Sequence, residues 1–121
     1  MLGKTWFSTS RLCDVLVFRL QQPAGLMHPD MIGDLSNAYS ASEWTDVRGV
    51  LVDCSQITYG NSMLLEGLLQ LQQCVRERGG RLALCGVNQV LGEILSVGHL
   101  DTLWNCFPSV EDGLQAFVDG D

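Results

Sequence analysis

The sequence predicts an α/β domain, in which helices pack against a β-sheet. Short apolar runs rich in β-branched residues alternate along the chain with segments whose apolar residues recur every three or four positions. That alternation is typical of strands connected by helices. The 121 residues, 46% of them apolar and 17% charged, have the length and composition of one globular domain with a single core.

The N-terminal part predicts one clear strand and then a helix. Asp14–Leu20 is rich in β-branched and aromatic residues, as strands are. A short extended piece at 26–27 follows. Pro29–Trp44 opens with a residue that suits a first helical turn and continues with apolar residues at helical spacing, so we expect a helix there, although Gly33 disfavours it. Whether residues 1–10 add an edge strand is left open.

The middle of the chain predicts a buried strand followed by an amphipathic helix. Gly49–Ser55 is continuously apolar before its polar end, which indicates burial on both faces of a sheet. The helix that follows starts at Asn61 or Ser62, and Gly79–Gly80 ends it as a left-handed cap. Its apolar stripe consists of Leu64, Leu68, Leu71 and Val75.

The C-terminal part predicts two further strand–helix pairs. Arg81–Val87 is an apolar strand, and Asn88 is a suitable N-cap for a helix that ends at Gly98. Thr102–Phe107 is a short, edge-like strand. The last helix starts at Ser109, with acidic residues in its first turn, where the helix dipole favours them.

Charge and hydropathy exclude several classes of function. The net charge is −7, and the seven Lys and Arg residues form no cluster beyond the segment 76–81, so we expect no nucleic-acid binding. An acidic surface suits solubility and a basic protein partner. The first residues lack the apolar core of a signal peptide, and no apolar run reaches membrane-spanning length. We therefore expect a cytoplasmic protein without a membrane span.

The cysteines predict neither a disulfide framework nor a metal site. Their number is odd, their spacings are wide, and none forms a zinc-ligand pattern with another Cys or a His. We therefore expect buried structural thiols in a reducing compartment. The five residues are Cys13, Cys54, Cys74, Cys85 and Cys106.

No constellation for catalysis is visible, so we expect a protein that is not an enzyme and needs no cofactor. The two histidines, His28 and His99, do not stand beside a nucleophile in a known elbow motif. No phosphate-binding or dinucleotide-binding fingerprint occurs. His28 lies beside a proline in a loop, where we expect a surface or partner-facing role, and His99 suits a helix C-terminus.

Ser62 has two interpretations. In the structural one, Ser62 or Asn61 caps the helix and accepts a hydrogen bond from a free backbone N–H group, which contributes about 1 kcal/mol. In the functional one, the hydroxyl is presented at a helix N-terminus, where unpaired N–H groups and the positive end of the helix dipole would hold a phosphate.

Three segments between 49 and 117 contain an ordered set of motifs: GVLVDCSQITYGNSMLLEGLLQL, VRERGGRLALCGVNQVLGEIL and GHLDTLWNCFPSVEDGLQAF. Through these segments the chain from about 14 to 117 resembles the STAS domain, the fold shared by bacterial anti-sigma factor antagonists and the cytoplasmic tails of sulfate transporters. The resemblance implies a mixed β-sheet of about four to six strands with about four α-helices. We accordingly expect one STAS-like domain over 1–121, with its core at about 14–118.

The resemblance also implies a function. Stand-alone family members are switches: an anti-sigma factor that is also a serine kinase binds the unphosphorylated form and phosphorylates its serine, and a phosphatase resets the system. By position, the phosphoacceptor here is Ser62. Asn61, Met63 and Leu64 stand where the family has an acidic residue, a second hydroxyl residue and a glycine. The alternative is therefore an unphosphorylated STAS subunit that binds constitutively within a transporter or signalling assembly; a homodimer is also left open.

The expected partner interface is centred on Tyr59, Ser62 and Met63, and a phosphate added there would disfavour the complex through its charge and its desolvation. Met63 and Leu64 would supply an apolar contact surface. The complete set of expected partner-binding residues is His28, Thr58, Tyr59, Asn61, Met63, Leu64 and Asn88.

Overall fold

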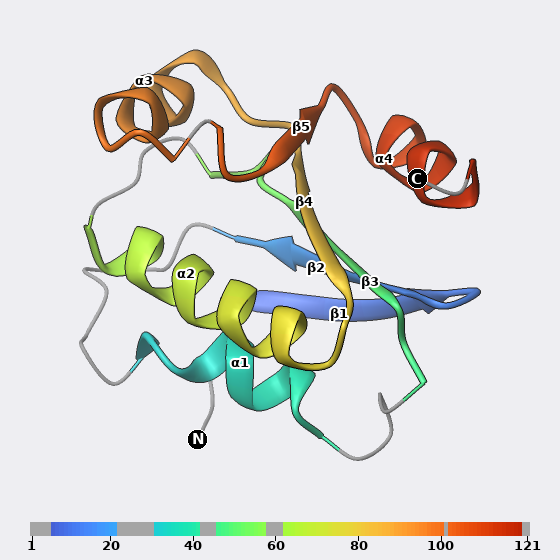
Figure 1. Ribbon diagram of the computed structural model, residues 1–121. Coiled ribbons are helices and arrows are strands. Elements are labelled where there is room, and N and C mark those ends of the chain that lie inside the picture. The colour runs from blue at the N-terminus through green and yellow to red at the C-terminus, as the bar shows by residue number, and fades with distance from the viewer. Residues whose placement is uncertain (1–5, 22–30, 42–45, 58–61, 101, 120–121) are drawn as a thin grey trace.

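The computed structural model describes residues 6–21, 31–41, 46–57, 62–100 and 102–119. Within these ranges the chain forms five strands and four helices that alternate after an initial pair of strands (Figure 1). In chain order they are β1 (Phe7–Leu12), β2 (Val15–Leu20), α1 (Asp34–Tyr39), β3 (Gly49–Asp53), α2 (Ser62–Glu77), β4 (Arg81–Cys85), α3 (Gln89–Val97), β5 (Asn105–Phe107) and α4 (Val110–Val118).

The strands form a single mixed sheet in the order β1-β2-β3-β4-β5. β1 is antiparallel to β2, whereas β2, β3, β4 and β5 are all parallel. The predicted α/β class, the mixed sheet and the numbers of strands and helices are therefore confirmed. The short strand predicted before Pro108 is β5, and it lies at the edge of the sheet as expected.

Helices cover both faces of the sheet, and the two faces bury different amounts of apolar surface. α1, α2 and α3 cover the face that carries Leu16, Phe18, Val50, Val52 and Leu84, where the larger core cluster forms. α4 covers the other face and packs against a smaller cluster of sheet residues. Figure 1 shows α1 and α2 on one side of the sheet and α4 on the opposite side. All five residues of β3 are buried, as its continuous apolar sequence predicted.

Two glycines allow α4 to approach the sheet closely. A Cβ atom at Gly49 would lie 2.6 Å from Cε1 of Phe117, and one at Gly113 would lie 2.7 Å from Cδ1 of Leu51. Side chains at these positions would push the helix away from β3. The small cluster on this face therefore depends on glycine from both the strand and the helix.

The edge strand β1 answers the question that the sequence left open. Its residues after Phe7 are exposed, so it lacks the apolar alternation that marks a half-buried strand. A two-residue turn pairs Leu12 with Val15, and Cys13 takes a positive φ of 57° in that turn. Glycine or asparagine usually occupies such a position, so the sequence pattern did not predict the hairpin.

Helix α1 is shorter than predicted. The expected helix covered 29–44, but among its described residues only Asp34–Tyr39 is α-helical, and residues 31–33 and 40–41 on either side are not. Gly33 occupies the N-cap position, consistent with its poor helix propensity. The expected extended piece at 26–27 lies outside the described residues.

The predicted caps at Asn88, Ser109 and Gly79 are confirmed, and the end of α3 differs in one respect. Asn88 and Ser109 cap α3 and α4 by accepting hydrogen bonds from the N–H groups of Leu91 and Asp112. Gly79 has the left-handed conformation expected after α2. At the end of α3, however, it is His99 that takes the positive φ, 61°, while Gly98 stays at −84°.

The expectation of buried thiols is right for two cysteines and wrong for two. Cys54 and Cys85 are fully buried, because they lie at the ends of the central strands β3 and β4. Cys13 and Cys106 are exposed, because the first is in the β1–β2 turn and the second is in the edge strand β5. Cys74 is half-buried on α2. No helix in the described ranges is long and apolar enough to cross a membrane.

These environments predict two classes of thiol reactivity. Burial raises the pKa of Cys85 to about 12, so at pH 8 roughly one thiol in ten thousand is ionised. We expect Cys13 and Cys106 to react with an aromatic disulfide reagent in the native protein, and Cys54 and Cys85 to react at least about 100-fold more slowly. The measurement is peptide mapping after timed labelling, with labelling in urea as the control. Equal native rates for all four thiols would contradict this account.

Candidate protein-interaction site

The carboxyl ends of β3 and β4 lie side by side at one end of the sheet. We call this end the carboxyl edge, as distinct from the edge strands β1 and β5. The parallel register pairs Asp53 with Cys85, so both strands end at the same level. The Cys54 N–H group donates to the Cys85 carbonyl at 2.8 Å, and the Ser55 N–H group donates to Oδ1 of Asp53 at 3.0 Å. The chain therefore leaves β3 through a turn held by the Asp53 side chain.

A second close contact fixes the way in which β4 leaves the sheet. Gly86 has a positive φ of 68°, and its N–H group donates to the Phe107 carbonyl at 3.0 Å. A Cβ atom at this position would lie 2.8 Å from Cβ of Ser55 and 2.9 Å from its backbone nitrogen. The exits of β3 and β4 therefore touch, and only glycine fits both the backbone angle and the space.

Asn88 connects the start of α3 to the segment that leads toward α2. Its Oδ1 atom accepts a hydrogen bond from the Leu91 N–H group at 2.8 Å and so caps α3. Its Nδ2 atom donates to the Ile57 carbonyl at 2.6 Å. Both polar ends of this side chain are engaged within the protein, so the structure gives Asn88 a positioning role at the carboxyl edge.

Two of the predicted contact residues lie in the first turn of α2, and they differ in exposure. Met63 is half-buried. Leu64 has only 2% of its surface exposed and belongs to the large core cluster. The expectation that Leu64 forms part of an apolar contact surface is therefore not supported: its side chain points inward and anchors the helix instead.

The remaining predicted residues are placed as follows. Ser62 is the first residue of α2. His28, Thr58, Tyr59 and Asn61 lie outside the described residues. The proposed cap by Asn61 or Ser62 and the interface centred on Tyr59 therefore stay predictions.

The ionisable groups at this edge favour a structural role for its buried residues. Asp53 is 9% exposed, and its Oδ2 atom lies 3.6 Å from Nε of Arg19. Burial, followed by the nearby Cys85 and Asp53, raises the pKa of the Cys54 thiol far above its usual range. Cys54 and Cys85 thus stay protonated and are poor nucleophiles at neutral pH. In the parts of the chain that the structure describes, no three His, Cys, Asp or Glu side chains gather as metal ligands.

Tertiary contacts at this edge were not predictable from the sequence motifs. The GV pair after β4 indicated a turn, but not that Gly86 contacts Ser55. The sequence showed Asn88 as a helix cap, but not its second hydrogen bond to Ile57, 31 residues away. Both contacts join segments distant in the sequence, and only the parallel pairing of β3 with β4 brings them together.

The comparisons with known proteins identify the family. The family model of the STAS domain matches residues 13–113. The chain belongs to the STAS domain family. No curated protein sequence matches this STAS chain significantly.

Solved structures share the fold of this STAS domain at low sequence identity. An anti-sigma-factor antagonist (STAS) domain protein from Planctomyces limnophilus is 23% identical, with a TM-score of 0.77 over 93% of this chain and 97% of its own. A variant of RsbS from Moorella thermoacetica is 13% identical, with a TM-score of 0.78 over 95% and 97%. The phosphorylated form of SpoIIAA from Bacillus is 14% identical, with a TM-score of 0.66 over 92% and 98%. At these identities the similarity shows a common fold.

The contact between the two strand exits leads to a stability prediction. Gly86→Ala should lower the free energy of unfolding by about 3 kcal/mol, because it adds a clash with Ser55 to the strain of a positive φ. Gly79→Ala is the matched control, since Gly79 has a φ of 78° but a Cβ atom there would have nothing within 4 Å; its expected loss is about 1 kcal/mol. Urea unfolding of both variants measures the difference. Equal losses would show that the contact with Ser55 contributes nothing.

Proposed function

We propose that this STAS domain is a partner-switching regulator. Its carboxyl edge binds an anti-sigma factor that is also a serine kinase, and phosphorylation of Ser62 weakens that complex. The observation that supports this proposal is the position of Ser62 as the first residue of α2, after the chain has left the carboxyl end of β3. By its place after the strand and at the helix start, Ser62 also corresponds to the family's phosphoacceptor serine.

The physical environment suits such a switch. The N-terminus of a 16-residue helix carries the partial positive charge of the helix dipole, which favours a phosphate. α2 itself is firmly seated, because Leu64, Leu68 and Leu71 are buried in the core. A phosphate would therefore change the charge of the surface without unfolding the helix. An interface formed around Met63 would lose affinity through desolvation and charge repulsion.

The solved relatives support the same proposal. SpoIIAA is an anti-sigma factor antagonist whose structure is known in an unphosphorylated and a phosphorylated form. By analogy, the partners of this domain are a kinase-type anti-sigma factor and a phosphatase, its site of action is the cytoplasm, and the domain itself catalyses no reaction. On this proposal residues 1–121 act as one regulatory unit.

A constitutive interaction module is the second candidate. Asn61 and Met63 replace an acidic and a hydroxyl residue of the family motif, which changes the surface that a kinase would recognise. Met63 is half-buried at the start of α2 and is an adaptable apolar contact. A structure of the stressosome, described as a signal integration and transduction hub, contains a chain of the same fold. In such an assembly the domain would bind without modification of Ser62.

Charge at Ser62 distinguishes the two candidates. We expect Ser62→Asp to weaken binding to the kinase-type partner by about tenfold or more, because a negative charge enters the interface. Ser62→Ala should bind within about twofold of the natural chain. Calorimetric titration of the partner with both variants gives the affinities, and circular dichroism checks that α2 stays folded.

Analysis of the protein from its own cells completes the test. Intact mass and site mapping at rest and under stress should show phosphate on Ser62 with a changing occupancy. Equal affinities of the two variants, together with an unmodified Ser62 in both states, would reject the switch and favour the constitutive module.

A further inference from the structure

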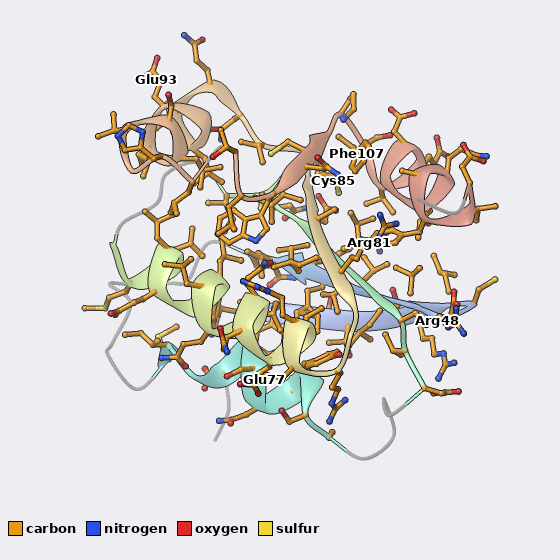
Figure 2. All side chains as sticks on the ribbon, viewed as in Figure 1. Arg48, Glu77, Arg81, Cys85, Glu93 and Phe107 are labelled. Carbon is orange, nitrogen blue, oxygen red and sulfur yellow. The ribbon has the colours of Figure 1, made fainter. Side chains whose placement is uncertain are left out.

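The amino ends of β3 and β4, opposite the carboxyl edge, gather positive charge in an otherwise acidic chain. Arg48 precedes β3 and Arg81 begins β4, and the Arg81 N–H group donates to the Arg48 carbonyl at 3.2 Å. Figure 2 shows both residues away from the end where Cys85 and Phe107 lie. Arg76 and Arg78 come from the end of α2, next to the same strand. Four of the seven Lys and Arg residues therefore belong to this region, although the net charge of the chain is −7.

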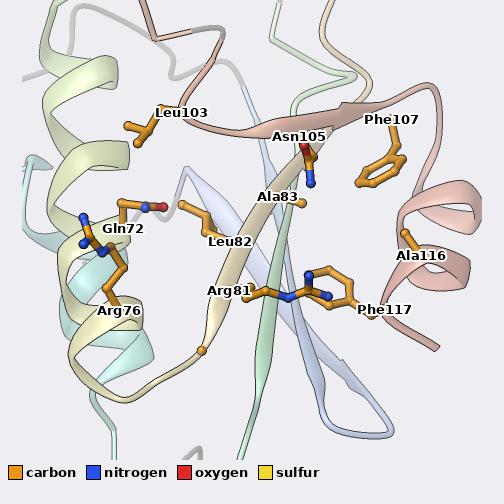
Figure 3. Close-up of a pocket in the computed structure, with 11 residues that line it drawn as sticks. Gln72, Arg76, Arg81, Leu82, Ala83, Leu103, Asn105, Phe107, Ala116 and Phe117 are labelled. Atoms are coloured by element: carbon orange, nitrogen blue, oxygen red, sulfur yellow. The ribbon is translucent and has the colours of Figure 1, made fainter. Parts of the chain in front are cut away.

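Two adjoining hollows run past these arginines. The first, of about 300 Å³, lies beside β4 between α2 and α4 and includes Arg76, Arg81, Leu82, Leu103 and Phe117 in its lining. Figure 3 shows Gln72 and Arg76 on the α2 side of it, and Arg81 beside Phe117 on the α4 side.

The second hollow, of about 840 Å³, extends along the strand ends past Arg48 and Arg78. Arg81 and Phe117 line both hollows, so the two hollows adjoin at these side chains. We call the two adjoining hollows the arginine groove and define it by Arg48, Arg76, Arg78 and Arg81.

The sheet edge is open beside the first hollow. β5 pairs with Ala83–Cys85 only, so Arg81 and Leu82 have no strand beside them on that side among the described residues. Backbone groups at an open sheet edge are available to an added extended chain. The Arg81 N–H group faces β3, where it donates to Arg48, so at this end of β4 it is the Leu82 backbone that faces the open side. The groove thus combines a short uncovered end of β4 with cationic side chains.

The acids of this protein do not neutralise the groove. The Arg76 guanidinium makes no hydrogen bond or ion pair within the part of the chain that the structure describes. The Arg81 guanidinium lies over the Phe117 ring, 5.5 Å from its centroid, and the Arg78 guanidinium lies 4.7 Å from the centroid of Tyr39. Neither of these two arginines forms an ion pair with a described carboxylate.

Among the described residues, two aspartates line the groove, and both belong to the second hollow. Asp46 is held by Arg11 through two hydrogen bonds of 2.8 and 3.0 Å, and the hydrogen bond with Arg11 lowers the pKa of Asp46. Asp14 lies 4.0 Å from Arg48, with both side chains largely exposed, so this pair is weak. The groove therefore keeps a positive charge that an anionic ligand would complement.

We propose that the arginine groove binds an extended, acidic segment of a protein partner. Guanidinium groups pair with carboxylates in a two-pronged geometry, and Leu82, Leu103 and Phe117 offer apolar contacts between them. The length of the groove favours a peptide over a small anion, which would fill only one hollow. A nucleic acid is disfavoured because the net charge of −7 opposes a long polyanion more strongly than a short acidic peptide, whose few carboxylates face the arginines. This surface lies at the opposite end of the strands from Ser62, so we expect its occupancy not to depend on the proposed switch.

A peptide-binding experiment tests the proposal. The probe is a fluorescein-labelled, end-capped peptide of about eight alternating glutamate and valine residues, and its matched control has lysine in place of glutamate. We expect the glutamate peptide to raise the fluorescence anisotropy on binding, with an affinity that falls as salt increases, and the lysine peptide to show no binding. Amide resonances of Arg81, Leu82 and Ala83 should shift in the ¹⁵N-labelled protein.

Matched variants locate the site. Arg76→Gln/Arg81→Gln should weaken glutamate-peptide binding by about tenfold or more, whereas Arg19→Gln, which removes a partly exposed cation elsewhere on the sheet, should change it by less than about twofold. Ser62→Asp should bind the peptide like the natural chain, so failure of the switch does not affect this result.

Three outcomes would overturn the proposal. They are equal binding to the natural chain and the double arginine variant, resonance shifts confined to the surroundings of Met63 and Asn88, and free glutamate or inorganic phosphate binding as tightly as the peptide. Unfolding curves of the variants confirm that the fold is intact before binding is compared.

Discussion

The parallel pairing of β3 with β4 is the constraint on which the rest of the structure depends. Both strands lie inside the sheet, and nearly all their side chains are buried. The register from Gly49–Arg81 to Asp53–Cys85 supplies partners for backbone groups that have no access to water. Because both faces carry apolar side chains, each needs a cover of helices, and the connections between parallel strands provide them.

The same pairing gives the molecule two chemically different ends. At the carboxyl edge the contacts are tight and largely uncharged: Gly86 touches Ser55, and Asn88 joins α3 to the segment after β3. At the amino ends, Arg48 precedes β3 and Arg81 begins β4, and the short strand β5 leaves part of β4 uncovered. The well-packed carboxyl edge suits a rigid switch surface. The open, cationic arginine groove suits an extended peptide with carboxylate side chains. A domain of this size can thus present two separate surfaces to two partners.

Much of the candidate site was visible in the sequence, but the direction of its side chains was not. The strand–loop–helix joint around Ser62 follows from a buried apolar run and an amphipathic stripe, and both were recognised. Leu64 was assigned to a contact surface, although its position in the apolar stripe already favoured the core in which it lies. Asn88 was assigned to a partner, yet both of its polar atoms bind inside the protein. The hairpin of β1 and β2 stayed undecided because Cys13 occupies a turn position that usually has glycine or asparagine.

The sequence by itself determined the α/β class, the approximate bounds of most elements, the caps at Asn88 and Ser109 and the family resemblance, because these depend on local periodicity and on ordered motifs. Tertiary structure alone decided which thiols are buried, that Gly49 and Gly113 allow α4 to approach the sheet closely, and that Arg48, Arg76, Arg78 and Arg81 line two adjoining hollows. These features join residues far apart in the chain. Local sequence patterns do not predict these features, because strand order, register and helix packing set the distances between such residues.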